Sequence, residues 1–589
     1  MKQLNYLVLL LLATIAALTS CSDDKESQSA GITDPSWTEG EVMEISTEKD
    51  VTVRFTAYDK WVANVINGAD WCKLSQSSGN KGTHSFIVSV NSETTTDRTA
   101  TITIKTDGHS SSFKVTQKAN GTAGDTQDAA ANRKVDEYLS KMYLWNDEYK
   151  TLKKDFNQGY EDFFYGNLLK MNANDLDKRP AGNGQYSLFS YIQKVPDISK
   201  TRAIEKELAY YFGITGITPV SIGSQTDYTI YFCIQGIYPE SPASEAGLKR
   251  GAMISLINGE KITESNINEY YRNLLLPDAA IQYTLTEDII EGNRITGQEE
   301  YPLTAKAMYA NPVIYNKVDE EYEGHRIGYL VYSGFEAGFD EELFNVFKEF
   351  KEKNITDLIL DLRYNGGGHV ISANLIASCV AGSSCSNKVF AQYRYNEERM
   401  KRFSSKPEEK FSYNKYANLG TSLAAGDLSL KRLYCLVGNS TASASELVIN
   451  SLRGIDIEVT LIGEKTTGKN VGMEATDIKI NDDTYHVTPI TFQSYNAKGF
   501  GAYENGFDPD VPIDELNPYN EKNVFYIHKE YGSDKEPLYA KAIELITGTN
   551  PMPPKTRHVA NALSGKARKM PALYRPGHSG MLKPVQTAE

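Results

Sequence analysis

The feature that most constrains the fold is an alternation of apolar strand-like segments with helical segments between Tyr301 and Gly548. Parallel strands need long crossover connections, and helices supply them, so this rhythm favours an α/β layer structure. Asp357 to Arg363 has the pattern of a buried strand, and Val370 to Val380 resumes as a helix after a glycine-rich turn. We therefore expect a largely parallel sheet with helices packed against it.

A different pattern, period-two alternation, runs from Glu41 to Lys118. Segments such as 51–56 and 101–105 alternate apolar and polar residues, and Gly, Asn and Asp separate them. This favours a β-sandwich of roughly 80 residues. A linker rich in Gly, Thr and Ala follows at 119–128, and an amphipathic helical stretch begins near Ala129.

Length and charge set wider limits. A chain of 589 residues exceeds what one hydrophobic core supports, so several domains are expected. The formal net charge of -14 argues against general nucleic-acid binding. The scattered cysteines lack the spacing of a metal site, which favours buried free thiols, although a Cys379–Cys385 disulfide stays open.

The N-terminus resembles a bacterial lipoprotein signal. Met1-Lys2 is followed by a mostly apolar stretch from Leu4 to Leu18 and then by Thr19-Ser20-Cys21. The resemblance implies cleavage before Cys21, acylation of its thiol and a lipid anchor in the outer membrane, on the periplasmic face or at the cell surface. No later run approaches the roughly 20 apolar residues of a membrane-spanning helix.

Two further stretches resemble known domains. Trp61, Trp71, the 97–104 stretch and the closing Val115-Thr-Gln-Lys resemble the BACON domains of Bacteroides-type surface proteins. This resemblance implies a spacer, or alternatively a glycan-binding module, and the two tryptophans are expected in its core rather than on a sugar-binding surface. Residues 241–259 closely resemble the central stretch of a PDZ domain.

The PDZ resemblance implies a groove that binds a polypeptide end by adding it as a strand. The loop that would hold the carboxylate is then Phe212, Gly213 and Ile214.

Three segments of the α/β region contain residues suited to chemistry. The Gly366-Gly367-Gly368 turn exposes backbone N–H groups at the start of a helix, where they could stabilise an oxyanion. Ser443 and Glu446 fit a helix capping box, which is the plain structural explanation of that serine. The same hydroxyl, between alanines at a helix N-terminus, is also a candidate nucleophile.

The third segment is a glycine-bounded loop that holds Lys469. It nearly matches the phosphate-binding loop G-x-x-x-x-G-K-[ST], but Asn470 stands where a Mg²⁺-binding hydroxyl is required. No convincing helix follows, and an exported chain meets little ATP. Nucleotide binding is therefore not favoured.

Taken in order, the three segments resemble the catalytic core of the S41 C-terminal processing peptidases. The matching motifs are Asp361-Leu-Arg-x-Asn-Gly-Gly-Gly, Thr441-Ala-Ser-Ala-Ser-Glu and Gly463-Glu-x-Thr-x-Gly-Lys. The resemblance implies Ser443 as nucleophile and Lys469 as general base, with neither metal nor cofactor. It implies oxyanion donors at the N–H groups of Ala444 and of Gly367 or Gly368. Lys469 must then lose its charge through burial.

Several details leave alternatives open. Met473 stands where the family usually has a Gln, so the group that orients Lys469 is unidentified. His369, beside the glycine turn, is an alternative base, although a satisfied structural histidine fits it better. Ser440 and Ser445 are weaker candidates for the nucleophile.

The sequence thus predicts a multidomain protein: a BACON-like β-sandwich, a helical segment, a PDZ domain and an α/β, crotonase-like S41 core. The expected boundaries are 1–21 signal, 22–35 tether, 36–119 sandwich, 129–204 helical segment, 205–290 PDZ domain, 300–548 catalytic domain and 549–589 disordered tail. The expected function is a serine endopeptidase that cleaves exported polypeptides near or from their C-termini. The alternative is a weakly active or inactive surface lipoprotein that binds peptide or glycan.

Overall fold

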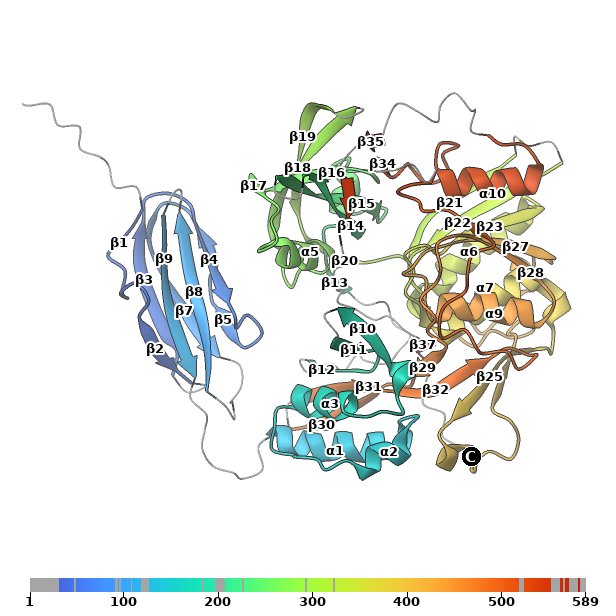
Figure 1. Ribbon diagram of the computed structural model, residues 1–589, viewed down its shortest axis with the longest axis horizontal. Coiled ribbons are helices and arrows are strands. Elements are labelled where there is room, and N and C mark those ends of the chain that lie inside the picture. Colours follow the sequence, from blue (N-terminus) through green and yellow to red (C-terminus); the bar gives the residue numbers. More distant parts are fainter. Residues whose placement is uncertain are drawn as a thin grey trace, which may run out of the picture. The chain divides into compact units, whose positions relative to one another are not determined.

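The computed structural model describes residues 31–570 and 581–582 with internal gaps (Figure 1). The gaps are 47–48, 91–93, 95–96, 107–108, 118–126, 183–184, 196–205, 207, 225–226, 292–293, 321, 323, 482, 519–523, 552–561 and 565–566. Cys21 and the predicted signal lie outside the described residues. The chain divides into two compact units, residues 1–124 and 125–589, and the boundary falls in the predicted linker.

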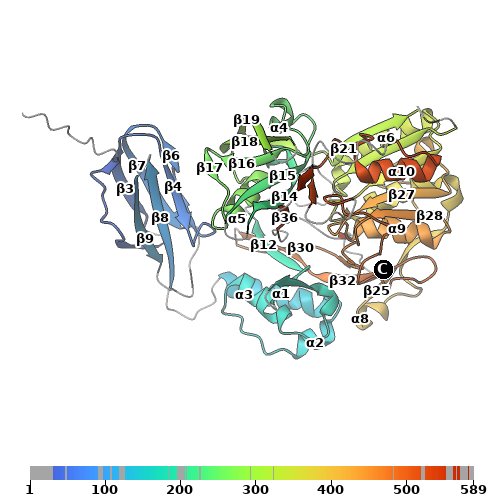
Figure 2. The same cartoon turned by 45° about the horizontal axis from the view of Figure 1, so that its top comes forward.

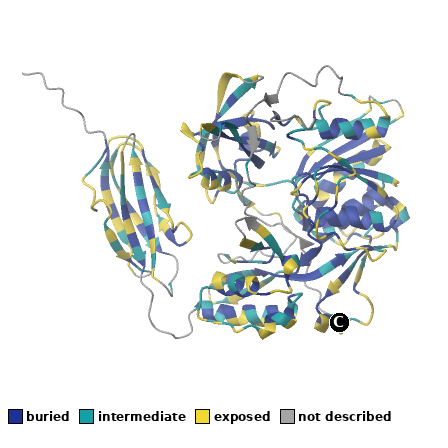
Figure 3. Cartoon of the chain, viewed as in Figure 1, coloured by how far each residue is buried: buried dark blue, intermediate teal, exposed yellow. Residues whose placement is uncertain are grey.

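The first unit contains two β-sheets. Their strand orders are β1-β3-β7-β5 and β2-β9-β8-β4-β6. The strands are β1 (Ile32–Thr33), β2 (Val42–Ile45), β3 (Val51–Ala57), β4 (Trp61–Ile66), β5 (Cys72–Leu74), β6 (Ser78–Gly79), β7 (Gly82–Val90), β8 (Arg98–Thr106) and β9 (His109–Gln117). Buried and exposed positions alternate along the strands, as Figure 3 shows.

Both tryptophans of this unit belong to its core. Trp61 is 1% and Trp71 6% exposed, and the Trp61 ring stacks on Phe86 at 5.8 Å. This confirms the prediction that they pack inside and offer no surface for a sugar. The predicted tether boundary at residue 35 is wrong, because half-buried Ile32 already pairs with Ala57.

The second unit opens with three helices, α1 (Gln127–Met142), α2 (Asn146–Thr151) and α3 (Tyr160–Leu169). The helical prediction for 129–204 is correct for this part and wrong from Lys178 onward. There the chain forms β10 (Lys178–Gly182), β11 (Gln185–Leu188) and β12 (Tyr191–Val195). β12 pairs with β31 (Asp483–Thr488), and partners so distant in sequence override local helical periodicity.

Residues 208–304 form a β-rich region with two short helices. Its strands are β13 (Leu208–Tyr211), β14 (Ile214–Gly223), β15 (Tyr228–Ile237), β16 (Met253–Ile257), β17 (Glu260–Lys261), β18 (Gln282–Glu291) and β19 (Arg294–Thr304). Its helices are α4 (Pro242–Glu245) and α5 (Ile267–Leu275). β14 through β19 share one antiparallel sheet over its own hydrophobic core, so this region extends past the predicted end at 290.

The expected parallel sheet is present, and its strand order is β21-β22-β23-β27-β28-β33. The strands are β21 (Val313–Asp319), β22 (Ile327–Tyr332), β23 (Asp357–Asp361), β27 (Arg432–Val437), β28 (Glu458–Gly463) and β33 (Val511–Pro512). Every pair is parallel except β21–β22. Parallel strands align their carboxyl ends, so the residues after β23, β27 and β28 are brought to one edge of the sheet.

Helices cover both faces of this sheet (Figures 1 and 2). On one face, side chains such as Leu360 and Cys435 pack in one core with α6 (Asp340–Glu352), α7 (Val370–Ala381) and α9 (Ala444–Gly454). On the other, Ile359 and Leu436 pack with α10 (Pro537–Thr547). The alternation of neighbouring strand residues between the two cores explains the continuous apolar strands in the sequence.

A second sheet lies beside the first, in the order β24-β37-β29-β32-β25-β26. Its strands are β24 (Gly368–His369), β37 (Met581–Leu582), β29 (Val471–Met473), β32 (Ile490–Tyr495), β25 (Val389–Tyr395) and β26 (Glu408–Lys410). The remaining strands are β20 (Lys306–Tyr309), β30 (Thr476–Ile480), β34 (Val524–Tyr526), β35 (Ala562–Ser564) and β36 (Ala567–Lys569), and a short helix is α8 (Glu397–Met400).

The prediction of a disordered tail after residue 548 is therefore wrong for β35, β36 and β37. Each of them pairs with an existing strand, which supplies hydrogen-bond partners that local sequence does not reveal. The described cysteines are buried free thiols, Cys379 and Cys385 included, as the cysteine spacing predicts. Among the described helices, none combines the length and the apolar character needed to span a membrane.

Candidate active site

Ser443 occupies a strained turn between β27 and α9. Its φ of 61° and ψ of -110° lie in a region that residues with side chains rarely adopt. The side chain is fully buried, and among the described residues its Oγ has no hydrogen-bond partner. A backbone strained to present an unpaired hydroxyl is a feature of functional sites.

The capping box predicted for Ser443 is present, with the Ser443 side chain towards the Glu446 backbone N–H and the Glu446 side chain towards the Ser443 backbone N–H. The Glu446 carboxylate accepts a hydrogen bond from the Ser443 backbone N–H at 2.9 Å. The serine half is the weaker one, because Oγ makes no hydrogen bond of ordinary length to the described residues. Capping therefore accounts for Glu446 more fully than for the serine hydroxyl.

The glycine turn packs directly against the serine. Gly367 has a φ of +106°, and a Cβ built there would lie 2.9 Å from the Ser443 Cβ. The Gly367 N–H donates to the Asn365 side-chain oxygen at 2.9 Å, and Asn365 in turn donates to the Tyr332 carbonyl at 2.8 Å. The Gly367 N–H is therefore already bonded within its own turn.

The backbone groups around Gly368 point alternately to the two edges of its strand. The Gly367 carbonyl and the His369 N–H both bond to Phe335, at 2.9 and 2.7 Å. Since N–H groups alternate between the two edges of a strand, the Gly368 N–H points to the opposite edge. The Ala444 N–H opens helix α9, where the helix dipole also favours a negative charge.

Lys469 is buried, with 1% of its surface exposed. Its Nζ lies 4.5 Å from the centre of the Phe189 ring and 4.0 Å from the Met473 Sδ. Burial lowers the pKa of Lys469 to about 7, a shift that the nearby Asp177 and Glu446 carboxylates partly oppose. A large fraction of this amine is therefore neutral near pH 7, as a general base requires.

Sequence reasoning missed two neighbours of this amine, Asp177 and Phe189, which come from the segment predicted as helical. Asp177 is fully buried, and its carboxylate accepts from Tyr143 Oη at 2.7 Å and from Ser190 N and Oγ at 2.7 and 2.6 Å. Burial raises its pKa, and Lys469 acts in the opposite direction. The alternation of polar and apolar residues in 185–195 was the available sequence signal that this segment forms strands rather than a helix.

Glu446 joins the serine turn to the lysine loop. One carboxylate oxygen accepts from Ser443 N and Lys469 N, at 2.9 and 2.8 Å. The other accepts from Thr466 Oγ1 and Gly468 N, at 2.6 and 2.7 Å. Four donors converge on this fully buried group, and their hydrogen bonds oppose the rise in pKa that burial causes. Glu446 thus fixes the relative position of the two loops.

Ser443 and Lys469 share the Glu446 carboxylate through their backbone N–H groups, and no direct bond joins the hydroxyl to the amine. Ser443 Oγ has no partner among the described residues, so Lys469 does not hydrogen-bond to it. Such bonds are often long before substrate binds. Of the alternatives, His369 Nδ1 lies 3.0 Å from the Phe335 carbonyl, Ser445 Oγ donates to the Asn365 carbonyl, and Ser440 is exposed.

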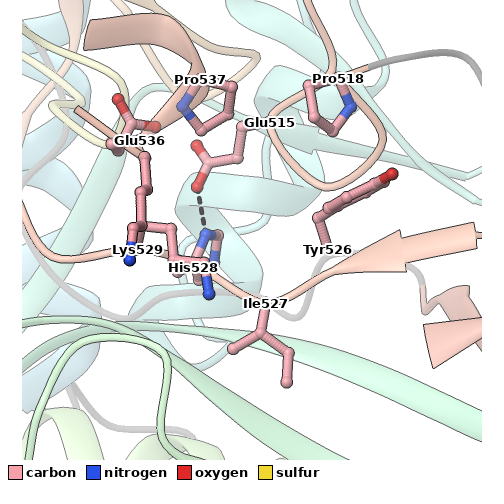
Figure 4. Close-up of a pocket in the computed structure, with 9 residues that line it drawn as sticks. Glu515, Pro518, Tyr526, Ile527, His528, Lys529, Glu536 and Pro537 are labelled. Atoms are coloured by element: carbon pink, nitrogen blue, oxygen red, sulfur yellow. Dashed lines mark ion pairs between the residues drawn. The ribbon is translucent and has the colours of Figure 1, made fainter. Parts of the chain in front are cut away.

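A buried charge network connects the 208–304 region to the glycine turn. Arg250 donates to Tyr364 Oη at 3.1 Å and pairs with Glu515 at 3.1 Å, and Tyr364 immediately precedes Asn365. Arg363 pairs with Glu536 at 2.7 Å. Figure 4 shows the ion pair between Glu515 and His528 in the same network. Removing one partner of such a buried pair costs about 3–5 kcal/mol, so the two regions are firmly linked.

The fold and this site define an α/β protein with the elements of serine-type acyl transfer: a strained serine, a buried amine and backbone donors. The model of Peptidase family S41 matches residues 326–513, and the BACON domain model matches residues 61–118. The chain contains an S41 peptidase domain and a BACON domain, as the motifs predict.

Two curated relatives agree with this assignment. The chain is 28% identical over 310 residues to the carboxyl-terminal-processing protease of Synechocystis, covering 52% of this chain and 63% of that protein. It is 25% identical over 399 residues to the carboxy-terminal processing protease CtpA of Bacillus subtilis, covering 67% of this chain and 73% of that protein. The chain thus spans less than two thirds of the Synechocystis relative.

One structural neighbour is a crystal structure from Bacteroides fragilis NCTC 9343 that is described as an S41 protease. It has a TM-score of 0.53 and 23% identity, and the alignment covers 73% of this chain and 99% of that one. This likeness shows the fold.

Proposed function

We propose that this protein is a serine endopeptidase in which Ser443 is the nucleophile and Lys469 the general base. One observation carries the proposal: an unpaired, buried hydroxyl in a strained turn is tied through Glu446 to a buried lysine whose pKa is about 7. Neither feature is needed for stability. Both features cost stability, and a peptide-cleaving site explains why the chain has them.

In the proposed reaction Ser443 Oγ attacks the carbonyl carbon of a peptide bond while Lys469 Nζ takes its proton. The oxyanion of the tetrahedral intermediate accepts hydrogen bonds from the N–H groups of Ala444 and Gly368. The intermediate collapses, Lys469 returns the proton to the leaving amine, and an acyl-enzyme remains. Water, deprotonated by Lys469, then releases the acyl group and restores the serine.

The substrate class follows from the 208–304 region, which we interpret as a PDZ domain. Gly213 has a φ of +101° and separates β13 from β14, where a carboxylate-binding loop of Phe212, Gly213 and Ile214 would lie. An extended polypeptide would add to the β14 edge with its end at this loop, and Arg250 would transmit its arrival to Tyr364 and the glycine turn. We therefore propose cleavage of exported polypeptides near or from their C-termini, by an enzyme held at the outer membrane through Cys21.

The direct test is degradation of an unstructured reporter polypeptide with varied C-terminal residues, by the parent protein, Ser443→Ala and Lys469→Ala. The proposal expects cleavage by the parent and a loss of at least about 10²-fold in either variant. Cleavage that survives Ser443→Ala would refute the nucleophile. Cleavage that survives Lys469→Ala would refute the base.

A second candidate is a peptide-binding protein without activity, and the absence of a Ser443–Lys469 bond together with Met473 favours it. A serine-directed fluorophosphonate separates the two functions. An active site becomes labelled at Ser443 with a rate that rises with pH through about 7, whereas a binding protein stays unlabelled.

A further inference from the structure

Two strand edges face one another beside the candidate active site. β24 carries Gly368, and β29 begins two residues after Lys469. The far edge of β24 bridges to Phe335, and the far edge of β29 pairs with β32. The facing edges therefore present backbone groups that need partners, and an extended chain between them would supply these partners. It would lie between the proposed oxyanion donor and the proposed base.

β37 occupies this position. Met581 pairs in parallel with Gly368 on one side and with Gly472 on the other, and Leu582 pairs with His369 and Met473. A strand of the chain itself thus completes both edges. It takes the place that the geometry gives to an extended substrate.

The same part of the chain also binds the edge of the 208–304 sheet. β36 pairs antiparallel with β14, matching Lys569 with Val220 and Ala567 with Ile222. The Met570 N–H donates to the Pro219 carbonyl at 3.0 Å, and Met570 packs against the hydrophobic core of that region. This is addition of a strand to a sheet edge, the mode by which PDZ domains hold peptides.

We propose that the tail strands, β36 and β37, are an internal ligand of both peptide-binding edges and that a substrate polypeptide must displace them. The inference rests on the proposed function and deepens it, since it names the first occupant of the same site.

The expected affinity of the tail strands for the two edges is low enough for a substrate to displace them. A tethered segment acts at an effective concentration on the order of mM. Each strand is short, three residues in β36 and two in β37, and a backbone hydrogen bond contributes only about 0.5–1.5 kcal/mol net. The tail strands therefore compete with a substrate without blocking the site permanently, which raises the apparent KM and leaves kcat unchanged.

The kinetic test uses the full chain with Met581→Pro and Leu582→Pro together, which removes the N–H donors of β37. We expect KM for an unstructured reporter to fall at least about threefold at constant kcat. Leu563→Pro is the matched control, because it disrupts β35, which pairs with β34 and with neither β24 nor β29. Parent-like KM in the double variant, or an equal fall in the control, would overturn the proposal.

A second measurement needs no activity. In a Ser443→Ala chain, the amides of Val471 to Met473 should exchange hydrogen at least about tenfold faster when the two prolines are present. A synthetic peptide of residues 562–582, added at mM concentration, should restore the protection, and with the active parent it should inhibit competitively. Unchanged amide exchange and no inhibition by the peptide would overturn the proposal that the tail strands are an internal ligand. Faster exchange in the proline variant, together with a parent chain that does not cleave the reporter, would refute only the proposed function.

Discussion

The amine of Lys469 lies 4.5 Å from the centre of the Phe189 ring, on a segment almost three hundred residues away in the sequence. The ring forms part of the buried surroundings of the amine, and burial disfavours the charged form of a lysine. Met473 offers the amine only a sulfur atom at 4.0 Å, so burial is the main cause of the lowered pKa. Part of the burial that keeps Lys469 neutral near pH 7 therefore comes from outside the matched S41 residues.

The first prediction concerns pH. Because Lys469 must be neutral to accept a proton, kcat/KM should rise with pH through about 7. Asp177 raises the pKa of Lys469 by its negative charge, so Asp177→Asn should move this rise to lower pH. Profiles from pH 5 to 9 for the parent and Asp177→Asn would show it. Asp175→Asn, two residues away with an exposed side chain, should leave the profile in place. An unmoved profile in Asp177→Asn would remove Asp177 from the site.

The second prediction concerns stability. The folded-state pKa of Lys469 is depressed from 10.5 to about 7, so the unfolded chain binds the proton more tightly between these values. The resulting penalty is complete below about pH 7 and vanishes as the pH rises towards 10.5. Lys469→Met should therefore raise the free energy of unfolding by a few kcal/mol at pH 6, and by less at pH 9.5.

Thermal unfolding of the parent and Lys469→Met at the two pH values measures this difference. Lys465→Met, in the same loop with half of its side chain exposed, is the control and should change Tm little. A Lys469→Met chain that is no more stable than the parent at pH 6 would show that burial of the amine is not costly.

The third prediction concerns Glu446. Glu446→Gln replaces an oxygen that accepts two hydrogen bonds by an NH₂ group that faces donors. We expect unfolding to cost roughly 1–3 kcal/mol less and cleavage to fall at least about 10²-fold, because the serine turn and the lysine loop lose their common anchor. Glu458→Gln, exposed at the start of β28, should match the parent in both measurements. Parent-like cleavage by Glu446→Gln would contradict the positioning role.

The S41 motifs predicted Ser443, Lys469 and the glycine turn, because each lies directly after a strand whose carboxyl end faces one edge of a parallel sheet. The motifs could not predict Asp177 and Phe189, since these residues lie in a short turn before β10 and between β11 and β12, and β12 forms by pairing with β31, far along the chain. The sequence also did not predict that the tail pairs with other strands, because β36 and β37 are too short to show an alternating pattern. The sequence also could not show that the Gly367 N–H donates to the Asn365 side chain, which is why Gly368 is the donor in the proposed reaction.

The fourth prediction uses the close packing of Gly367 against the nucleophile. Gly367→Ala places a methyl group 2.9 Å from the Ser443 Cβ and 3.0 Å from the Ala444 N, so cleavage and fluorophosphonate labelling should both be lost. Gly499→Ala is the matched control, because it also has a positive φ, of +78°, but open space around it. The control should lose only about 1 kcal/mol of stability and keep its activity. Full labelling of Gly367→Ala would contradict the described packing.

The hydrogen bonds that converge on the Glu446 carboxylate also have a consequence for how the protein folds. Ser443, the lysine loop and the glycine turn follow three different strands of one sheet, and parallel pairing of this kind is a late and slow event in folding because it joins distant parts of the chain. Until β23, β27 and β28 align, the carboxylate, the amine and the hydroxyl are separate side chains on an open polypeptide. A nascent or partly unfolded chain of this protein therefore lacks the assembled site, and the proposed cleavage requires that the parallel sheet has already formed.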